Sequence, residues 1–205
     1  LPIMPTASTA DGPIDETSQR RSVQYCLQCG AVAIGHFGIA SEFHKIADRD
    51  RTRLIEIIVD EVAGRVPFFV GVTSPGAGIS LEYARQAADL GADMIMASLP
   101  YVDIPDRDGA FAFYEQLSRA TPLPIIVQDT PACSSILSAD LLWQMVRDIE
   151  NVCHVKAEGK SFLEKTHTLL RLSGGRMSVI GGAGGKHLFH LLRLGVTAFM
   201  TGTEA

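Results

Sequence analysis

An amine and a carboxylate stand two residues apart at the end of a short apolar run, within residues 151–159. Because side chains alternate along a β-strand, Lys156 and Glu158 are expected to point to the same face. A lysine in a partly desolvated pocket has a lowered pKa and attacks a ketone carbonyl, while a neighbouring carboxylate moves protons. The stretch therefore predicts Schiff-base chemistry at Lys156 with Glu158 as the acid–base group. A salt bridge at the end of a strand is the alternative.

The composition is that of one folded domain with a sizeable core. The chain has 205 residues, of which 46% are hydrophobic and 20% are charged. A net charge of -5 without a Lys/Arg cluster argues against nucleic acid or a membrane surface as partner and favours a small metabolite. No apolar run approaches the roughly 20 residues that cross a bilayer, and the first residues lack the basic start of a signal peptide. We expect a cytoplasmic protein.

The four cysteines are Cys26, Cys29, Cys133 and Cys153. They are scattered, and the close pair Cys26-x-x-Cys29 has no second pair at zinc-finger spacing, so we expect buried free thiols. A metal or redox site is the alternative. We predict neither a metal nor a cofactor.

Apolar runs alternate with helix-like segments along the whole chain. Strands are expected at residues 1–4, 31–35, 66–72, 92–97, 123–127, 152–157, 177–181 and 196–200. Helices are expected at residues 15–29, 48–63, 80–90, 108–120, 138–148, 161–172 and 186–194. This order predicts an α/β fold, a (β/α)8 TIM barrel. A doubly wound open sheet is the alternative, but it usually carries a Gly-rich phosphate turn after its first strand, and none is present.

The chain ends directly after the eighth expected strand, at Ala205. About 250 residues are typical of this barrel. We therefore expect residues 1–205 to form a single barrel domain that is truncated after strand eight, without the last helix or a C-terminal helical extension.

The active site of such a barrel lies at the carboxyl ends of the strands. The candidates there are Ala40, Ser41, Glu42, Tyr101, Gln128, Asp129, Lys156, Glu158 and Gly181. Each has a structural explanation when taken alone, but together they favour a site. Ser41 and the backbone beside it are expected to bind a substrate carboxylate, with capping of the next turn as the alternative. The Gly-rich run 181–185 is expected to make room for substrate.

Several motifs resemble the dihydrodipicolinate synthase and N-acetylneuraminate lyase superfamily of Schiff-base-forming barrels. They are Gly38-Ile39-Ala40-Ser41-Glu42, Gly64-Arg65-Val66-Pro67, Gly91-Ala92-Asp93, Leu99-Pro100-Tyr101, Leu123-Pro124-Ile125-Ile126 and Lys156. The family's two loop threonines are Ile39 and Ala40 here, the second tyrosine of its Pro-Tyr-Tyr is Val102, and the tyrosine of its Tyr-Asn-x-Pro is Gln128. The resemblance implies an imine at Lys156, a small-molecule 2-keto acid substrate and a homo-oligomer, either tetramer or dimer.

Within the superfamily, three features most resemble the L-2-keto-3-deoxypentonate (L-2-keto-3-deoxyarabonate) dehydratases. They are the run from Val127 to Ala132, the pair Ser41-Glu42 and the arrangement Lys156-x-Glu158. This resemblance implies a hydro-lyase that converts a 2-keto-3-deoxy sugar acid to 2-oxoglutarate semialdehyde, with Lys156, Glu158 and Gln128 as catalytic residues. A dihydrodipicolinate synthase-like enzyme, a pyruvate-dependent aldolase and a catalytically inactive keto-acid-binding barrel are the alternatives.

Overall fold

The computed structural model describes residues 1–131 and 135–201. In this part of the chain, seven helices alternate with seven strands. The helices are α1 (Glu16–Gln28), α2 (Asp48–Val62), α3 (Ala77–Asp89), α4 (Arg107–Ala120), α5 (Ala139–Asp148), α6 (Phe162–Ser173) and α7 (Leu188–Arg193). The strands are β1 (Ile34–His36), β2 (Phe68–Gly71), β3 (Met94–Ala97), β4 (Ile125–Asp129), β5 (Val152–Ala157), β6 (Ser178–Gly181) and β7 (Ala198–Phe199). Short 3-10 helices follow β1 and β6: η1 (Ile39–Ser41), η2 (Phe43–Lys45) and η3 (Ala183–Gly185).

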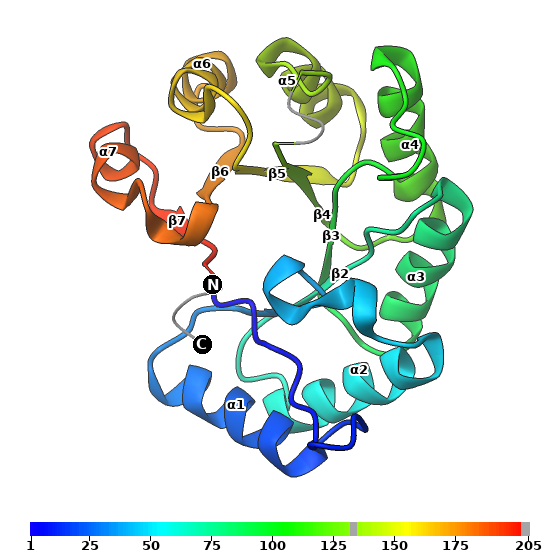
Figure 1. Ribbon diagram of the computed structural model, residues 1–205. Helices are drawn as coiled ribbons and strands as arrows, with labels where there is room; N and C mark the ends of the chain where they lie inside the picture. Colours follow the sequence, from blue (N-terminus) through cyan, green and yellow to red (C-terminus); the bar gives the residue numbers. More distant parts are fainter. Residues whose placement is uncertain (132–134, 202–205) are drawn as a thin grey trace.

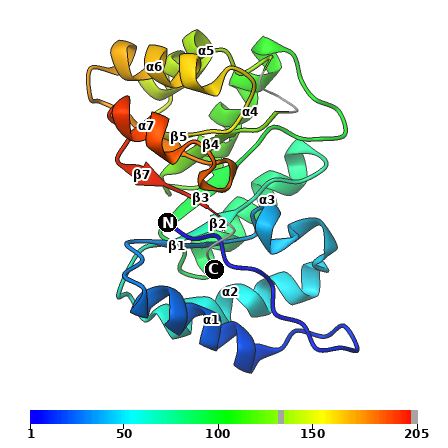
Figure 2. The ribbon, with the colours of Figure 1, turned by 60° about the vertical axis from the view of Figure 1, so that its left-hand side comes forward.

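All the strands lie in one parallel sheet in the order β1-β2-β3-β4-β5-β6-β7. The sheet curls, and the helices surround it on its outer side (Figure 1). Figure 2 shows the same ring from the side, with α1 and α2 at one end of the view and α5 and α6 at the other. The predicted α/β fold with parallel strands is confirmed, and a consequence is that the carboxyl ends of all the strands meet at one edge.

The first expected strand is not a strand in the structure. Residues 1–4 make only an isolated bridge, Ile3 to Gly35, in which the Met4 N–H donates to the Gly35 carbonyl at 2.9 Å. Alternate residues donate to the same neighbour, so Pro2, two residues before Met4, has no N–H to extend the ladder with β1 toward the N-terminus. The Ile3 N–H donates to the Thr201 carbonyl at 2.9 Å, which places the N-terminal segment between β1 and the residues after β7 (Figure 1).

The sheet is buried on both faces, which explains why its strands read as continuous apolar runs. A large core between sheet and helices includes Ile125, Val127 and Val155. A smaller core fills the inside of the curled sheet and consists of Ile3, Ala33, Phe69, Met96, Ile126, Ile180 and Met200. The inside and outside positions alternate along each strand, so the outward neighbours Val127 and Val155 fix which side chains of β4 and β5 face inward.

Two helix starts that the sequence predicts carry a side-chain cap. The Asp15 carboxylate accepts from the Ser18 N–H at 3.0 Å, and the Ser138 hydroxyl accepts from the Leu141 N–H at 3.3 Å, at the two starts that the sequence predicts. Helix α3 begins at Ala77, three residues before the expected start at Ser80, and its N-cap residue is Gly76, without a side-chain cap. The packed helices and strands form a rigid scaffold, and the loops that follow the strands can carry site residues.

Candidate active site

Lys156 lies near the end of β5 and faces the inside of the curled sheet. It is paired with Gln128 on β4 and with Ile180 on β6, and paired residues of parallel strands share a face. The residue is only 4% exposed. Burial lowers the pKa of the Lys156 ammonium, and the nearby Glu158 carboxylate acts in the opposite direction without cancelling it. Lys156 is thus an amine whose environment disfavours the charged form.

Glu158 follows β5 directly and is the charged partner of Lys156. Its Oε2 atom lies 3.1 Å from Lys156 Nζ, so the predicted position on the same face is confirmed. The same Oε2 accepts a hydrogen bond from Gln128 Nε2 at 2.8 Å, and Oε1 accepts one from the Ala183 N–H at 2.9 Å. A carboxylate with these donors is fixed in one place beside the amine.

A cavity of about 240 Å³ opens beside these side chains. Its polar wall is formed by Gln128, Lys156 and Glu158. The rest of its lining is apolar or carries no side chain, and consists of Ile3, Ile39, Ala40, Gly184 and Met200. This is the shape of a small-molecule site: a mostly apolar hollow with a few converging polar groups.

Of the predicted substrate-binding residues in the loop after β1, Ala40 lines this cavity, beside Ile39 of the same loop, whereas Ser41 and Glu42 do not. Ser41 is fully buried, and its hydroxyl donates to the Met4 carbonyl at 2.6 Å, where it attaches the loop to the N-terminal segment. Glu42 pairs with Lys45 at the surface and lines a different hollow with Ser41. Ser41 and Glu42 follow the same strand end as Ala40, but their side chains contact Met4 and Lys45 and not the cavity of Lys156.

Asp129 and Gly181 lie on the outer face of the sheet. Asp129 follows Gln128 on β4, so alternation turns its side chain toward α6, where Lys165 Nζ donates to Asp129 Oδ2 at 2.7 Å. Gly181 packs against α7 and β7: a Cβ atom there would lie 2.8 Å from Leu191 Cδ1 and 2.6 Å from Phe199 Cδ1. Neither residue is among those that line the cavity beside Lys156.

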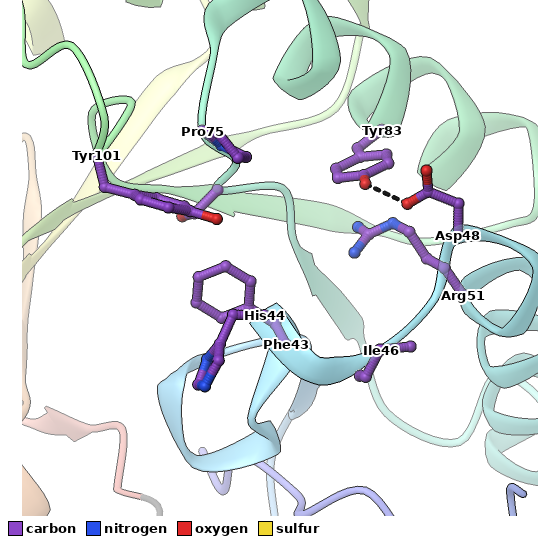
Figure 3. A pocket seen from close by; sticks show the side chains of 9 residues that line it. Phe43, His44, Ile46, Asp48, Arg51, Pro75, Tyr83 and Tyr101 are labelled. Atoms are coloured by element: carbon purple, nitrogen blue, oxygen red, sulfur yellow. Dashed lines mark hydrogen bonds between the residues drawn. The ribbon is translucent and has the colours of Figure 1, made fainter.

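Tyr101 lines a second hollow, of about 180 Å³, between the loops after β1, β2 and β3 (Figure 3). In Figure 3 it stands opposite Tyr83 and Arg51, and Phe43 and His44 form the near wall. The Arg51 guanidinium is buried between the rings of Phe37 and Tyr83, at 4.2 and 4.1 Å from their centroids. Tyr101 is therefore separate from the cavity of Lys156 within this chain.

Sequence reasoning missed part of the cavity wall. Ile3 and Met200 line the cavity because the N-terminal segment and the residue after β7 lie side by side, which no local pattern reveals. Gly184 belongs to the Gly-rich run that the sequence analysis connected with substrate, and it does line the cavity. The pattern found the run but not the particular glycine.

No group of three His, Cys, Asp or Glu side chains that could hold a metal ion is found among residues 1–131 and 135–201.

Cys26 is buried, Cys29 is exposed and Cys153 is half-buried, all as free thiols, so the expected burial is wrong for Cys29. Cys133 lies outside the described residues. None of the described helices is long and apolar enough to cross a membrane.

The fold and site define a class: an α/β protein with a buried lysine and carboxylate on a cavity at the carboxyl edge of a curled parallel sheet. The chain matches the dihydrodipicolinate synthetase family over residues 1–205 and belongs to it. The family resemblance predicted from the sequence is confirmed, and with it the prediction of a chain from a lyase family.

Two relatives and one solved structure illustrate what the chain is similar to. The chain is 34% identical over 209 residues to L-2-keto-3-deoxyarabonate dehydratase of Azospirillum brasilense, covering 98% of this chain and 67% of that protein. It is 26% identical over 172 residues to 4-hydroxy-tetrahydrodipicolinate synthase of Pelobacter propionicus, covering 84% of this chain and 59% of that protein. The crystal structure of dihydrodipicolinate synthase from Acinetobacter baumannii, complexed with pyruvate, has the same fold, with a TM-score of 0.90 and 24% identity over 98% of this chain and 69% of that one.

Proposed function

We propose that the protein is a Schiff-base-forming lyase that removes water from a 2-keto-3-deoxy sugar acid. The observation that carries this proposal is the arrangement of three side chains on one cavity wall: Lys156, with Glu158 at 3.1 Å, and Gln128 bound to that same carboxylate. L-2-keto-3-deoxypentonate is the proposed substrate and 2-oxoglutarate semialdehyde the product.

The first step is attack of the Lys156 amine on the C2 ketone. The nitrogen forms a bond to C2, the ketone oxygen takes up a proton of the amine and one from solvent and leaves as water, and a protonated imine, the iminium, remains. A lysine at its ordinary pKa of about 10.4 is almost wholly protonated at neutral pH. Burial of Lys156 lowers its pKa and so raises the fraction of reactive free amine.

The second step is elimination. The iminium makes the C3 protons acidic, and Glu158 beside it takes one of them while the C4 hydroxyl departs with a proton as water. The carbon product carries a C3–C4 double bond conjugated with the iminium. Loss of a C5 proton and protonation of C3 move this double bond to C4–C5 as an enol, which becomes the C5 aldehyde, and water then hydrolyses the iminium to free Lys156. Glu158 suits this role because its carboxylate is fixed next to the amine by Gln128 and Ala183.

Aldol cleavage would require a base for the C4 hydroxyl proton. Gln128 stands on β4 where the superfamily resemblance has a tyrosine, and an amide has no useful pKa for that transfer. The likeness to the Azospirillum dehydratase supports dehydration, whereas the other relatives include synthases such as that of Pelobacter propionicus. An aldolase or synthase is for that reason the second candidate.

The chain spans 67% and 59% of the lengths of these two relatives, so the activity proposed is that of the whole protein. A closed (β/α)8 barrel, with the N-terminal segment and the residues after β7 as neighbours, is part of the proposal, as is a single domain over residues 1–205. The hydrogen bond from Ile3 to Thr201 supports closure. A homo-oligomer that acts on a small 2-keto acid in the cytoplasm stays a prediction.

Borohydride reduction in the presence of pyruvate or a 2-keto-3-deoxy acid tests the imine. We expect a single adduct, mapped by peptide mass spectrometry to Lys156. Incubation with a panel of 2-keto-3-deoxy acids, followed for semialdehyde and for pyruvate, then separates the activities. Semialdehyde release indicates a dehydratase, pyruvate release an aldolase, and an adduct with no product a binding protein. The absence of an adduct on Lys156 would contradict the whole proposal.

The acid–base role is tested by Glu158→Gln, which keeps the size of the side chain and removes its charge. A general acid–base group typically contributes about 10² to 10⁴ in rate, so we expect dehydration to fall by that order while the adduct on Lys156 still forms. A variant that dehydrates at the wild-type rate would show that Glu158 is only an ion-pair partner of Lys156.

A further inference from the structure

The position of Glu158 depends on the loop that follows β6 on the neighbouring strand. The Ala183 N–H of that loop donates to Glu158 Oε1 at 2.9 Å, while Gln128 and Lys156 occupy Oε2. The carboxylate is thus held from β4, from β5 and from the loop after β6. Of these contacts, the one to Oε1 comes from backbone and does not depend on the side chain at position 183.

Gly182 makes the room for this contact. A Cβ atom at position 182 would lie 2.3 Å from Glu158 Cγ and 2.6 Å from both Cδ and Oε1. Real Cβ atoms do not approach other atoms so closely, so an alanine there forces the Glu158 side chain to move. The φ of Gly182 is -116°, outside the left-handed region that favours glycine, and the close approach of Glu158 is what excludes a Cβ atom at this position.

We propose that Gly182 and the Ala183 N–H are the positioning groups that hold the Glu158 carboxylate beside Lys156 for its acid–base step. This inference rests on the proposed function and adds to it the source of the alignment. A carboxylate displaced by about 1 Å loses much of its effect on a reacting proton, because acid–base catalysis depends on hydrogen-bond reach.

The ionisation of Lys156 gives a readout that is independent of turnover. The charged group facing Lys156 is Glu158; the facing positions on β4 and β6 are Gln128 and Ile180, and the opposite wall presents Ile3 and Ile39. Moving the carboxylate away weakens the contact with Glu158 that favours the ammonium form, so the pH at which half of Lys156 is trapped by borohydride must fall.

The experiment compares Gly182→Ala with Gly78→Ala in the intact protein. Gly78 lies within α3, and a Cβ there meets nothing within 4 Å, so it controls for the substitution itself. We expect Gly182→Ala to lower the dehydration rate by the same roughly 10²- to 10⁴-fold as Glu158→Gln and to shift the trapping profile to lower pH, while Gly78→Ala changes neither. The double variant Gly182→Ala with Glu158→Gln should lose no more than Glu158→Gln alone, because both act through one carboxylate.

An additive loss in the double variant, or a trapping profile at the wild-type pH in Gly182→Ala, overturns the inference. An absence of any adduct in the wild type overturns the proposed function instead, so the two failures are distinguishable. If Gly182→Ala does not fold, ¹⁵N-alanine NMR of the wild type and of Glu158→Gln still tests the contact between the Ala183 N–H and Glu158. The Ala183 amide proton should resonate further downfield and exchange more slowly in the wild type than in Glu158→Gln, and identical behaviour in both proteins overturns the inference.

Discussion

Two lysine–carboxylate pairs lie back to back at the carboxyl end of β4 and β5. On the inner face, Lys156 and Glu158 are 3.1 Å apart and line a cavity. On the outer face, Lys165 and Asp129 are 2.7 Å apart between the sheet and α6. In both pairs the lysine side chain is almost fully buried, at 6% and 8% exposed. The two pairs therefore have the same residue types and similar burial of the lysine, but they face different surroundings.

The two pairs differ in the groups and the space that surround the ammonium and the carboxylate. Lys165 also donates to the Leu137 carbonyl at 2.7 Å, so its charge is held by packed protein on the outer side of the sheet. Lys156 has Glu158 as its partner and an open cavity beside it. A buried ion pair alone does not identify a catalytic lysine, because structural pairs are equally buried. Access to a cavity distinguishes the two.

Replacing each lysine by methionine should give opposite results, and this is the largest effect we expect. Lys165→Met leaves Asp129, which is 0% exposed, as an uncompensated buried charge, and we expect a loss of about 3–5 kcal/mol in the free energy of unfolding. Lys156→Met should abolish the borohydride adduct and turnover. Its unfolding free energy should change by about 1 kcal/mol at most, because Glu158 keeps Gln128 and the Ala183 N–H as donors.

Denaturant unfolding and adduct formation per folded molecule measure the two effects side by side. Equal losses of unfolding free energy in both variants would show that both pairs are structural ion pairs. An adduct that still forms in Lys156→Met but not in a folded Lys165→Met would show that Lys165, and not Lys156, forms the imine.

The double variant Asp129→Leu with Lys165→Met sharpens the structural side of the comparison. Replacing both members of a buried pair by apolar residues of similar size is often neutral or stabilising, since no charge is left behind. We expect the double variant to recover most of the stability that Lys165→Met loses, as measured by the same denaturant unfolding. A double variant as unstable as the single one would mean that Asp129 has a further role, for example in holding the end of β4.

Strand alternation is the part of this arrangement that the sequence predicts well. The spacing of Lys156 and Glu158 put them on one face, and the structure agrees. The same rule separates Gln128 from Asp129, adjacent on β4, although the sequence analysis placed both in the site because both follow the apolar run. Grouping residues by strand end does not say which face each one occupies, so the substrate-binding role of Asp129 stays a prediction.

Contacts between distant segments are the part that the sequence does not predict. Ser41 is held by the Met4 carbonyl, and Ile3 reaches the cavity through its hydrogen bond with Thr201. Both contacts depend on the path of the N-terminal segment across the molecule. The apolar and proline residues of that segment do not predict this path. The need for a glycine at position 182 likewise comes from Glu158 on another strand, not from the local turn.

The smallest effect concerns the pH dependence of stability and follows from the lowered pKa of Lys156. Its pKa in the folded protein is below the unfolded value of 10.5, so between these two values the unfolded state binds more protons than the folded state. Stability contributed by this residue must then rise as pH increases through that window, with a slope of at most about 1.4 kcal/mol per pH unit. Below the folded pKa both states are protonated, and the contribution is constant and unfavourable.

The measurement is the difference in unfolding free energy between the wild type and Lys156→Met, from pH 7 to 10. Subtracting the variant cancels the groups that titrate alike in both proteins. We expect the wild type to gain on the variant as the pH rises, since burial of Lys156 costs less once the amine is neutral. A flat difference would mean that Glu158 fully offsets the burial, and Lys156 would then resemble the structural pair rather than a nucleophile. A falling difference would mean that the folded protein favours the ammonium, which would contradict a role in imine formation at neutral pH.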